Sequence, residues 1–107
     1  MASSAKLHHP ERDEIELPAV LHALSDPQRL AIVRQLANDT EPRPCGTLNL
    51  GLAKSTMTHH FRVLRESGVV RQKRVGTTKF TSLRREDLDA RFPGLLDAVL
   101  EPAATPA

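Results

Sequence analysis

The sequence has no tryptophan or tyrosine and only three phenylalanines in 107 residues. Its core must therefore consist mainly of Leu, Val and Ala, a composition that favours helices. A single cysteine, Cys45, excludes an intrachain disulfide framework and fits a reducing compartment. No apolar run approaches the roughly 18 residues that span a bilayer, and residues 1–17 lack the apolar segment of a secretory signal. We therefore expect a cytoplasmic protein with no membrane partner.

The net charge of +2 conceals an uneven distribution of charge along the chain. Residues 54–85 contain nine cations and one acid, Glu66, and so carry a charge of +8. The remainder of the chain carries −6. One third of the protein is therefore suited to contact a polyanion, and the rest is not.

The chain is long enough for one domain, and a domain of this size is only marginally stable alone. Residues 1–14 are polar, charged and aperiodic, which predicts a disordered arm. We expect one folded domain over residues 15–101 and a flexible tail over residues 102–107. Oligomerisation would compensate for the small core.

Apolar spacing predicts helices over residues 16–24, 27–37 and 54–67. Ser25-Asp26-Pro27 is a helix start signal, and Gly68 is suited to end the third of these helices. Residues 40–46 should form a loop, and a short helix is expected within residues 48–53. A further helical pattern covers residues 83–100, which Pro93 should interrupt.

Between these helices the pattern changes to β-branched and polar residues over 69–75 and 77–82, with Gly76 at the turn. This pattern predicts a two-stranded hairpin. The fold class is thus mainly α with one β-hairpin. A basic helix preceded by a short helix and followed by a basic hairpin is suited to enter a major groove of double-stranded DNA.

The basic helix presents short polar side chains near its start, and the hairpin adds cations. We expect base contacts from Ser55, Thr56, Thr58 and His59. We expect phosphate contacts from Lys54, Arg62, Arg65, Lys73, Arg74 and Lys79. His60 should be half-buried and hydrogen-bonded.

Three segments resemble the ArsR/SmtB family of dimeric winged helix-turn-helix repressors. Residues 24–36 (LSDPQRLAIVRQL) are similar to its D-P-x-R-x-x-I-L-x-x-L segment, and residues 55–70 (STMTHHFRVLRESGVV) to its recognition helix. Residues 71–76 and 79–83 are similar to its wing. The resemblance covers roughly residues 17–100. It implies a transcriptional repressor that binds an inverted-repeat operator.

The resemblance also implies a homodimer formed by the first and last helices. The residues concerned are Leu17, Val20, Leu21, Leu24, Leu95, Leu96 and Val99. Their apolar stripes exceed the needs of one small core, which fits this expectation.

The chain departs from the metal sensors of the family. Only Cys45 stands where the Cys-x-Cys motif is expected, and residues 84–101 contain no His. We therefore expect no metal or cofactor, and no residue pattern identifies an inducer. Cys45 could be a redox or electrophile switch, could join two protomers, or could be a small apolar loop residue.

Two other functions compete with DNA binding as interpretations of the sequence. An enzyme would need Cys45 and His59 or His60 as nucleophile and base, but the spacing supplies no third group. A winged-helix protein-interaction module is the stronger rival. It gives no reason, however, for a charge of +8 on the basic helix and hairpin.

Overall fold

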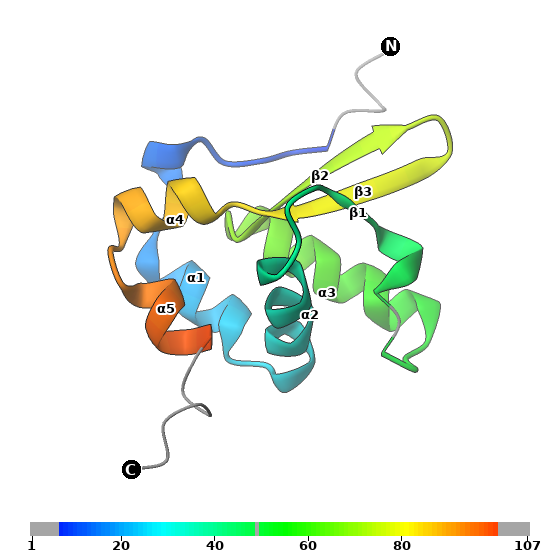
Figure 1. The fold of residues 1–107 in the computed structure, drawn as a ribbon, viewed down its shortest axis with the longest axis horizontal. Coiled ribbons are helices and arrows are strands. Elements are labelled where there is room, and N and C mark those ends of the chain that lie inside the picture. Colours follow the sequence, from blue (N-terminus) through cyan, green and yellow to red (C-terminus); the bar gives the residue numbers. More distant parts are fainter. Residues whose placement is uncertain (1–6, 49, 101–107) are drawn as a thin grey trace.

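The computed structural model describes residues 7–48 and 50–100. Its elements follow the predicted order of helices, hairpin and helices (Figure 1). The helices are α1 (Leu17–Leu24), α2 (Pro27–Ala37), α3 (Lys54–Glu66), α4 (Arg85–Arg91) and α5 (Leu95–Leu100), with short 3-10 helices η2 (Arg12–Glu14) and η3 (Cys45–Thr47). The strands are β1 (Arg43–Pro44), β2 (Val70–Val75) and β3 (Thr78–Leu83).

Helix α2 begins at the predicted start signal. The Asp26 carboxylate accepts hydrogen bonds from the backbone N–H groups of Gln28 at 2.7 Å and Arg29 at 3.2 Å. Pro27 occupies the first helical position, where its missing N–H has no cost. These two features fix the turn between α1 and α2.

Helix α3 ends in a Schellman motif at Gly68, as the sequence predicts. The N–H of Val69 donates to the Leu64 carbonyl at 3.0 Å, and that of Gly68 donates to the Arg65 carbonyl at 3.1 Å. Gly68 has φ +91°, a conformation that glycine adopts without strain. Val69 and Leu64 are both fully buried, which supplies the apolar contact of the motif.

The hairpin forms the expected wing, with Val75 opposite Thr78 and Gln72 opposite Thr81. The sheet has a third strand that the sequence did not predict, because β1 lies within the expected loop over residues 40–46. Arg43 pairs with Thr81 and Pro44 with Phe80, so the strand order is β1-β3-β2.

The short helix expected within residues 48–53 is wrong over its described part, residues 48 and 50–53. The helical turn lies earlier, at η3, and Gly51 has φ +74°, which a helix does not accept. Asn49 lies outside the described residues. Leu48 is fully buried and ties this segment to the core.

The C-terminal helical pattern starts later than predicted, because Leu83 belongs to β3 and α4 begins at Arg85. The predicted interruption at Pro93 is confirmed. Residues 92–94 separate α4 from α5, and Gly94 has φ +84°.

Residues 7–14, expected within a disordered arm, have defined contacts with the domain and run beside α4 toward β2 (Figure 1). Pro10 is buried, and its carbonyl accepts a hydrogen bond from Arg84 at 2.8 Å. Arg12 forms an ion pair with Asp87 at 2.7 Å. Arg84 and Asp87 are distant in the sequence, so a local sequence pattern could not predict these contacts. Residues 1–6 and the predicted tail over 102–107 lie outside the described residues.

The core lies between α1, α2, α3 and the start of the sheet. Its fully buried side chains include Ile15, Val20, Ile32, Leu48, Leu64, Val69, Val70, Leu88 and Leu96. Within the described residues, no helix has the length and apolar character needed to cross a membrane.

Candidate nucleic-acid interface

Helix α3 buries one face in its second half, while its first two turns are mostly exposed. His60, Phe61 and Leu64 point into the core. Six of the predicted DNA-contacting residues are exposed on the opposite side: Lys54, Ser55, Thr56, Thr58, His59 and Arg62. Within the described residues, no side chain caps the first turn, which follows Ala53. Its N–H groups therefore remain available to an anion.

His60 is buried and hydrogen-bonded, as predicted, although more deeply than predicted. Its Nδ1 lies 3.3 Å from Nη1 of Arg29. Because a guanidinium can only donate, Nδ1 accepts this hydrogen bond and the ring proton resides on Nε2. The ring of His59 lies 6.0 Å from that of His60, outside the core. His60 thus supports the helix, and His59 is free to reach a base.

Arg29 connects three helices beneath the exposed face of α3. Besides contacting His60, its guanidinium donates to the Ala23 carbonyl at 2.7 Å and to the His22 carbonyl at 3.2 Å. Arg29 itself is 6% exposed. The end of α1 and the middle of α3 are therefore held in register by one side chain.

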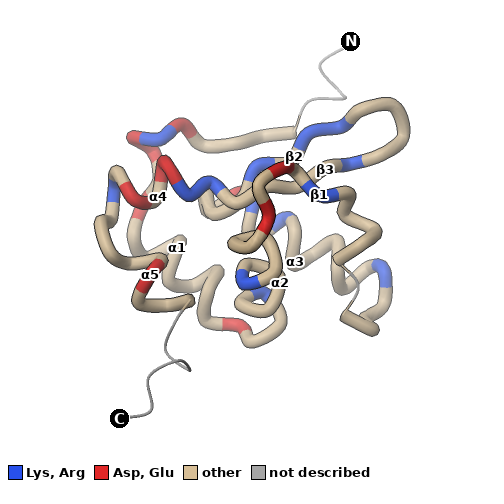
Figure 2. The backbone as a smooth tube through the Cα atoms, in the orientation of Figure 1, with Lys and Arg blue, Asp and Glu red and all other residues tan. Residues whose placement is uncertain are grey.

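The hairpin supplies the second cationic surface. Lys73 and Arg74 are exposed on β2, and Lys79 is half-buried on β3. Figure 2 shows that Lys and Arg follow α3 and the hairpin, whereas Asp and Glu gather around η2, α4 and the segment after α2. Of the nine cations in residues 54–85, Arg71, Arg84 and Arg85 form ion pairs with Asp87 or Asp97, and the other six lie on α3 and the hairpin.

Arg65, another predicted DNA contact, differs from Arg62 because its guanidinium has hydrogen-bond partners within the protein. Its Nη1 donates to Oε1 of Gln72 at 2.9 Å, and its Nε donates to the His8 carbonyl at 3.2 Å. Arg65 therefore joins α3 to the base of the hairpin and to the arm, and it is less available to a phosphate than Arg62.

Gln72 is a residue that sequence reasoning missed. It is 3% exposed and occupies an inward position of β2, after the buried Val70. Its amide donates to Thr81 Oγ1 at 3.2 Å and to Cys45 Sγ at 3.3 Å, while its carbonyl oxygen holds Arg65. A polar side chain at an inward position of a strand was the available signal.

Cys45 is half-buried, and its Sγ lies 2.8 Å from Thr81 Oγ1. Within the described part of the chain, no hydrogen bond joins it to His59 or His60, so the nucleophile and base of the enzyme hypothesis are not paired. The same residues contain no cluster of three or more potential metal ligands. A redox role for Cys45 stays a prediction.

Two titratable groups mark the contacts of residues 7–14 with the domain, His9 at β2 and Asp87 on α4. Burial lowers the pKa of His9, as do the nearby charges of Arg71, Arg65 and Arg84, although a backbone hydrogen bond opposes them. His9 Nε2 accepts a hydrogen bond from the Gln72 N–H at 2.9 Å, so this nitrogen carries no proton. Burial raises the pKa of Asp87, but hydrogen bonds from Arg12 and Arg84 outweigh it and hold the pKa below its usual value.

The expected dimer residues divide into two groups. Val20, Leu24 and Leu96 belong to the core of the protomer itself and are at most 7% exposed, so their assignment to a dimer surface is wrong for this conformation. Leu17 and Leu21 are 40% and 47% exposed on α1. Leu95 and Val99 are half-buried on α5.

The sequence and the fold are both similar to those of known proteins. A family model for a helix-turn-helix domain matches residues 24–73. The HTH-type transcriptional regulator YceK of Bacillus subtilis, itself uncharacterised, is 34% identical over 82 residues, which cover 75% of this chain and 82% of the relative. The chain belongs to the HTH-type transcriptional regulators, and its fold is that of ArsR-family winged helix-turn-helix structures. It is therefore a DNA-binding transcriptional regulator.

Solved structures of similar fold include two further regulators. The transcriptional repressor BigR of Xylella fastidiosa is 28% identical, with a TM-score of 0.63 over 84% of this chain and 87% of that protein. The homodimeric winged helix-turn-helix DNA-binding domain Mb0332 of Mycobacterium bovis is 24% identical, with a TM-score of 0.57 over 95% of this chain and all of that domain. In the winged helix-turn-helix fold that these structures share, α3 takes the place of the recognition helix and β2–β3 that of the wing.

Proposed function

We propose that this regulator is a repressor that binds an inverted-repeat operator as a homodimer in the bacterial cytoplasm. The observation that carries the proposal is the exposed face of α3 beside a cationic hairpin, with a charge of +8 over residues 54–85. Repression would follow because the bound dimer excludes polymerase from the promoter. BigR, a relative of similar fold, is a repressor.

We assign recognition of the DNA base sequence to α3. Ser55, Thr56, Thr58 and His59 are short, exposed and close to the start of α3, where a helix approaches base edges in the major groove. The phosphates on either side would be held by Lys54, Arg62, Lys73, Arg74 and Lys79. Arg65 would act indirectly, through its hold on Gln72.

The dimer proposal rests on the apolar side chains that α1 leaves exposed. Leu17 and Leu21 lie one helical turn apart and would pack against the same residues of a second copy, with Leu95 and Val99 at the edge. A two-fold axis there would place two copies of α3 about 34 Å apart, one turn of DNA.

Salt dependence tests the DNA contacts. The double variant Lys73→Ala/Arg74→Ala is expected to weaken binding to every duplex and to reduce the salt slope by about 4, because the dimer loses four phosphate contacts, two in each protomer. Arg34→Ala removes an exposed cation from α2 and serves as the control. His59→Ala should instead change the preference among sites. Unchanged affinity of the wing variant at low salt would refute the docking.

Sedimentation tests the dimer. Leu21→Glu is expected to give a monomer with weakened operator binding, whereas Ala90→Glu on the exposed side of α4 should leave both unchanged. A wild-type monomer at micromolar concentration that still binds an inverted repeat tightly would refute the dimer.

A further inference from the structure

A groove of about 730 Å³ lies between α3, the hairpin and four residues that precede α3, namely Cys45, Gly46, Leu48 and Leu52. Its volume falls within the roughly 300–1,000 Å³ typical of small-molecule sites. One side of it is α3, from Lys54 to Arg65, and the other is formed by Gln72, Thr77 and Lys79. The groove therefore lies between the two elements proposed to contact DNA.

Part of the wall of the groove is apolar, and DNA binding does not require apolar side chains there. Leu7, Leu52 and Met57 line it and keep part of their surface accessible to solvent. They come from three separate segments of the chain. A phosphodiester backbone gains nothing from such a wall, whereas an organic ligand with an apolar body would bury it.

The charged residues of the groove are all cations. Lys54, Arg62, Arg65 and Lys79 line it, and its described lining contains no Asp or Glu. Arg65 is held by Gln72, but Lys54, Arg62 and Lys79 form no ion pair with any described carboxylate. The groove therefore contains three cations that no described carboxylate neutralises.

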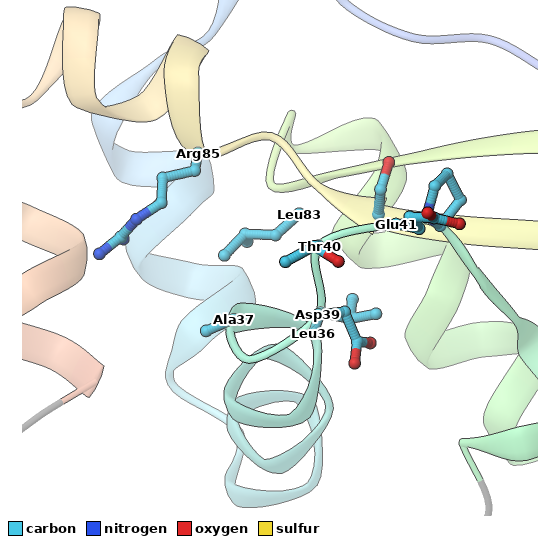
Figure 3. Close-up of a pocket in the computed structure, with 9 residues that line it drawn as sticks. Leu36, Ala37, Asp39, Thr40, Glu41, Leu83 and Arg85 are labelled. Carbon is cyan, nitrogen blue, oxygen red and sulfur yellow. The ribbon is translucent and has the colours of Figure 1, made fainter.

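Another cavity, lined by described residues, differs in this respect. It has a volume of about 210 Å³ and lies between the end of α2 and the start of α4. Figure 3 shows the carboxylates of Asp39 and Glu41 among its lining side chains, with Arg85 on the other side. Its mixed charges and small size do not select an anion with an apolar body.

We propose that the groove between α3 and the hairpin binds an organic anion with an apolar body, for example a medium-chain carboxylate, and that this ligand displaces DNA. The displacement rests on the proposed function, because Lys54, Arg62 and Lys79 are the same cations that would hold phosphates. The ligand would lay its apolar body against Leu7, Leu52 and Met57. Binding of ligand and duplex would then be mutually exclusive.

Calorimetry on the full chain without DNA tests the site itself. The probes are decanoate, which has both an apolar body and a negative charge, decanol, which lacks the charge, and acetate, which lacks the body. Decanoate is expected to bind at least tenfold more tightly than either control. Equal affinity for decanoate and decanol, or no binding of decanoate, would overturn the proposal.

Two variants locate the site. Gly46 lines the groove, and a Cβ built there meets no atom within 4 Å, so Gly46→Leu should fold and fill the groove. It is expected to weaken decanoate binding at least tenfold, and Ala90→Leu on α4 is the matched control. Leu52→Gln, which makes the wall polar, should weaken decanoate binding as well. Full decanoate affinity in both groove variants would overturn the assignment.

Displacement is then measured with an operator duplex. At a decanoate concentration ten times its dissociation constant, exclusive binding raises the apparent Kd for DNA about elevenfold for each groove, and so about 120-fold for a dimer whose two grooves must both be empty. Decanoate binding without any change in DNA affinity would overturn the competition. If the protein binds no duplex at all, the proposed function fails, while the calorimetric result still decides whether the groove takes the anion.

Discussion

Replacement of Gly68 by alanine should destabilise the domain more than replacement of any exposed glycine. Gly68 has φ +91°, and a Cβ built there would lie 2.6 Å from Cγ1 and 2.8 Å from Cδ1 of Ile15. Ile15 is 1% exposed, so it has no room to move away. The methyl group would therefore meet both an unfavourable backbone conformation and a packed core.

The two contributions can be estimated separately. The left-handed backbone costs about 1–2 kcal/mol for a residue with a Cβ, and an overpacked core costs about 1–3 kcal/mol. Gly68→Ala should therefore lower the free energy of unfolding by about 2–5 kcal/mol, and the Tm by roughly 10 °C or more. Gly76→Ala, at φ +65° with no atom within 4 Å, carries the backbone contribution alone.

Thermal and urea unfolding at one fixed protein concentration would measure both variants, because dimerisation would make stability concentration-dependent. A double-mutant cycle with Ile15→Ala isolates the contact. In that background Gly68→Ala should cost no more than Gly76→Ala. Equal losses for Gly68→Ala and Gly76→Ala in the wild-type background would refute the argument.

Three more outcomes can be checked by unfolding experiments. The pKa of His9 is lowered, chiefly by burial, so the unfolded chain binds more protons than the folded one. The free energy of unfolding should therefore fall as the pH drops below about 6.5. His9→Gln should flatten that dependence over the same range. The pKa of Asp26 is lowered, chiefly by the hydrogen bond from the Arg29 N–H, so its contribution should be present at neutral pH and lost as the pH falls through that lowered value; Asp26→Asn should lack this acid-range loss. Arg29→Met should cost about 2–4 kcal/mol, because the buried acceptors at the end of α1 lose their donor; a cost under about 0.5 kcal/mol would refute that role.

Local signals predicted much of the fold. Asp26-Pro27 and Gly68 fixed the start of α2 and the end of α3, because capping depends on residues close in sequence. Strand β1 could not be predicted in this way, because Arg43 and Pro44 are strand residues only through their pairing with β3. The order in residues 7–14 depends likewise on distant partners, among them Arg84 and Asp87.

The candidate site, too, could be predicted only where it depends on residues close in sequence. Helical spacing was sufficient to place Thr58 and His59 on the exposed face of α3. It could not show that Arg65 is engaged by Gln72, seven residues away on another element. Nor could apolar spacing distinguish Val20, which is fully buried, from Leu21, which is 47% exposed, because core and interface use the same side chains.

The strand order leaves β2 at one margin of the sheet, where its outward N–H and C=O groups could pair with another chain. The imidazole of His9 occupies one of those positions by accepting from the Gln72 N–H. We therefore expect residues 7–14 to hinder pairing of β2 with a strand of another molecule, in addition to their contact with the wing. A chain shortened to begin at residue 15 should precipitate or form β-rich aggregates at concentrations where the full chain stays dispersed, which light scattering would reveal.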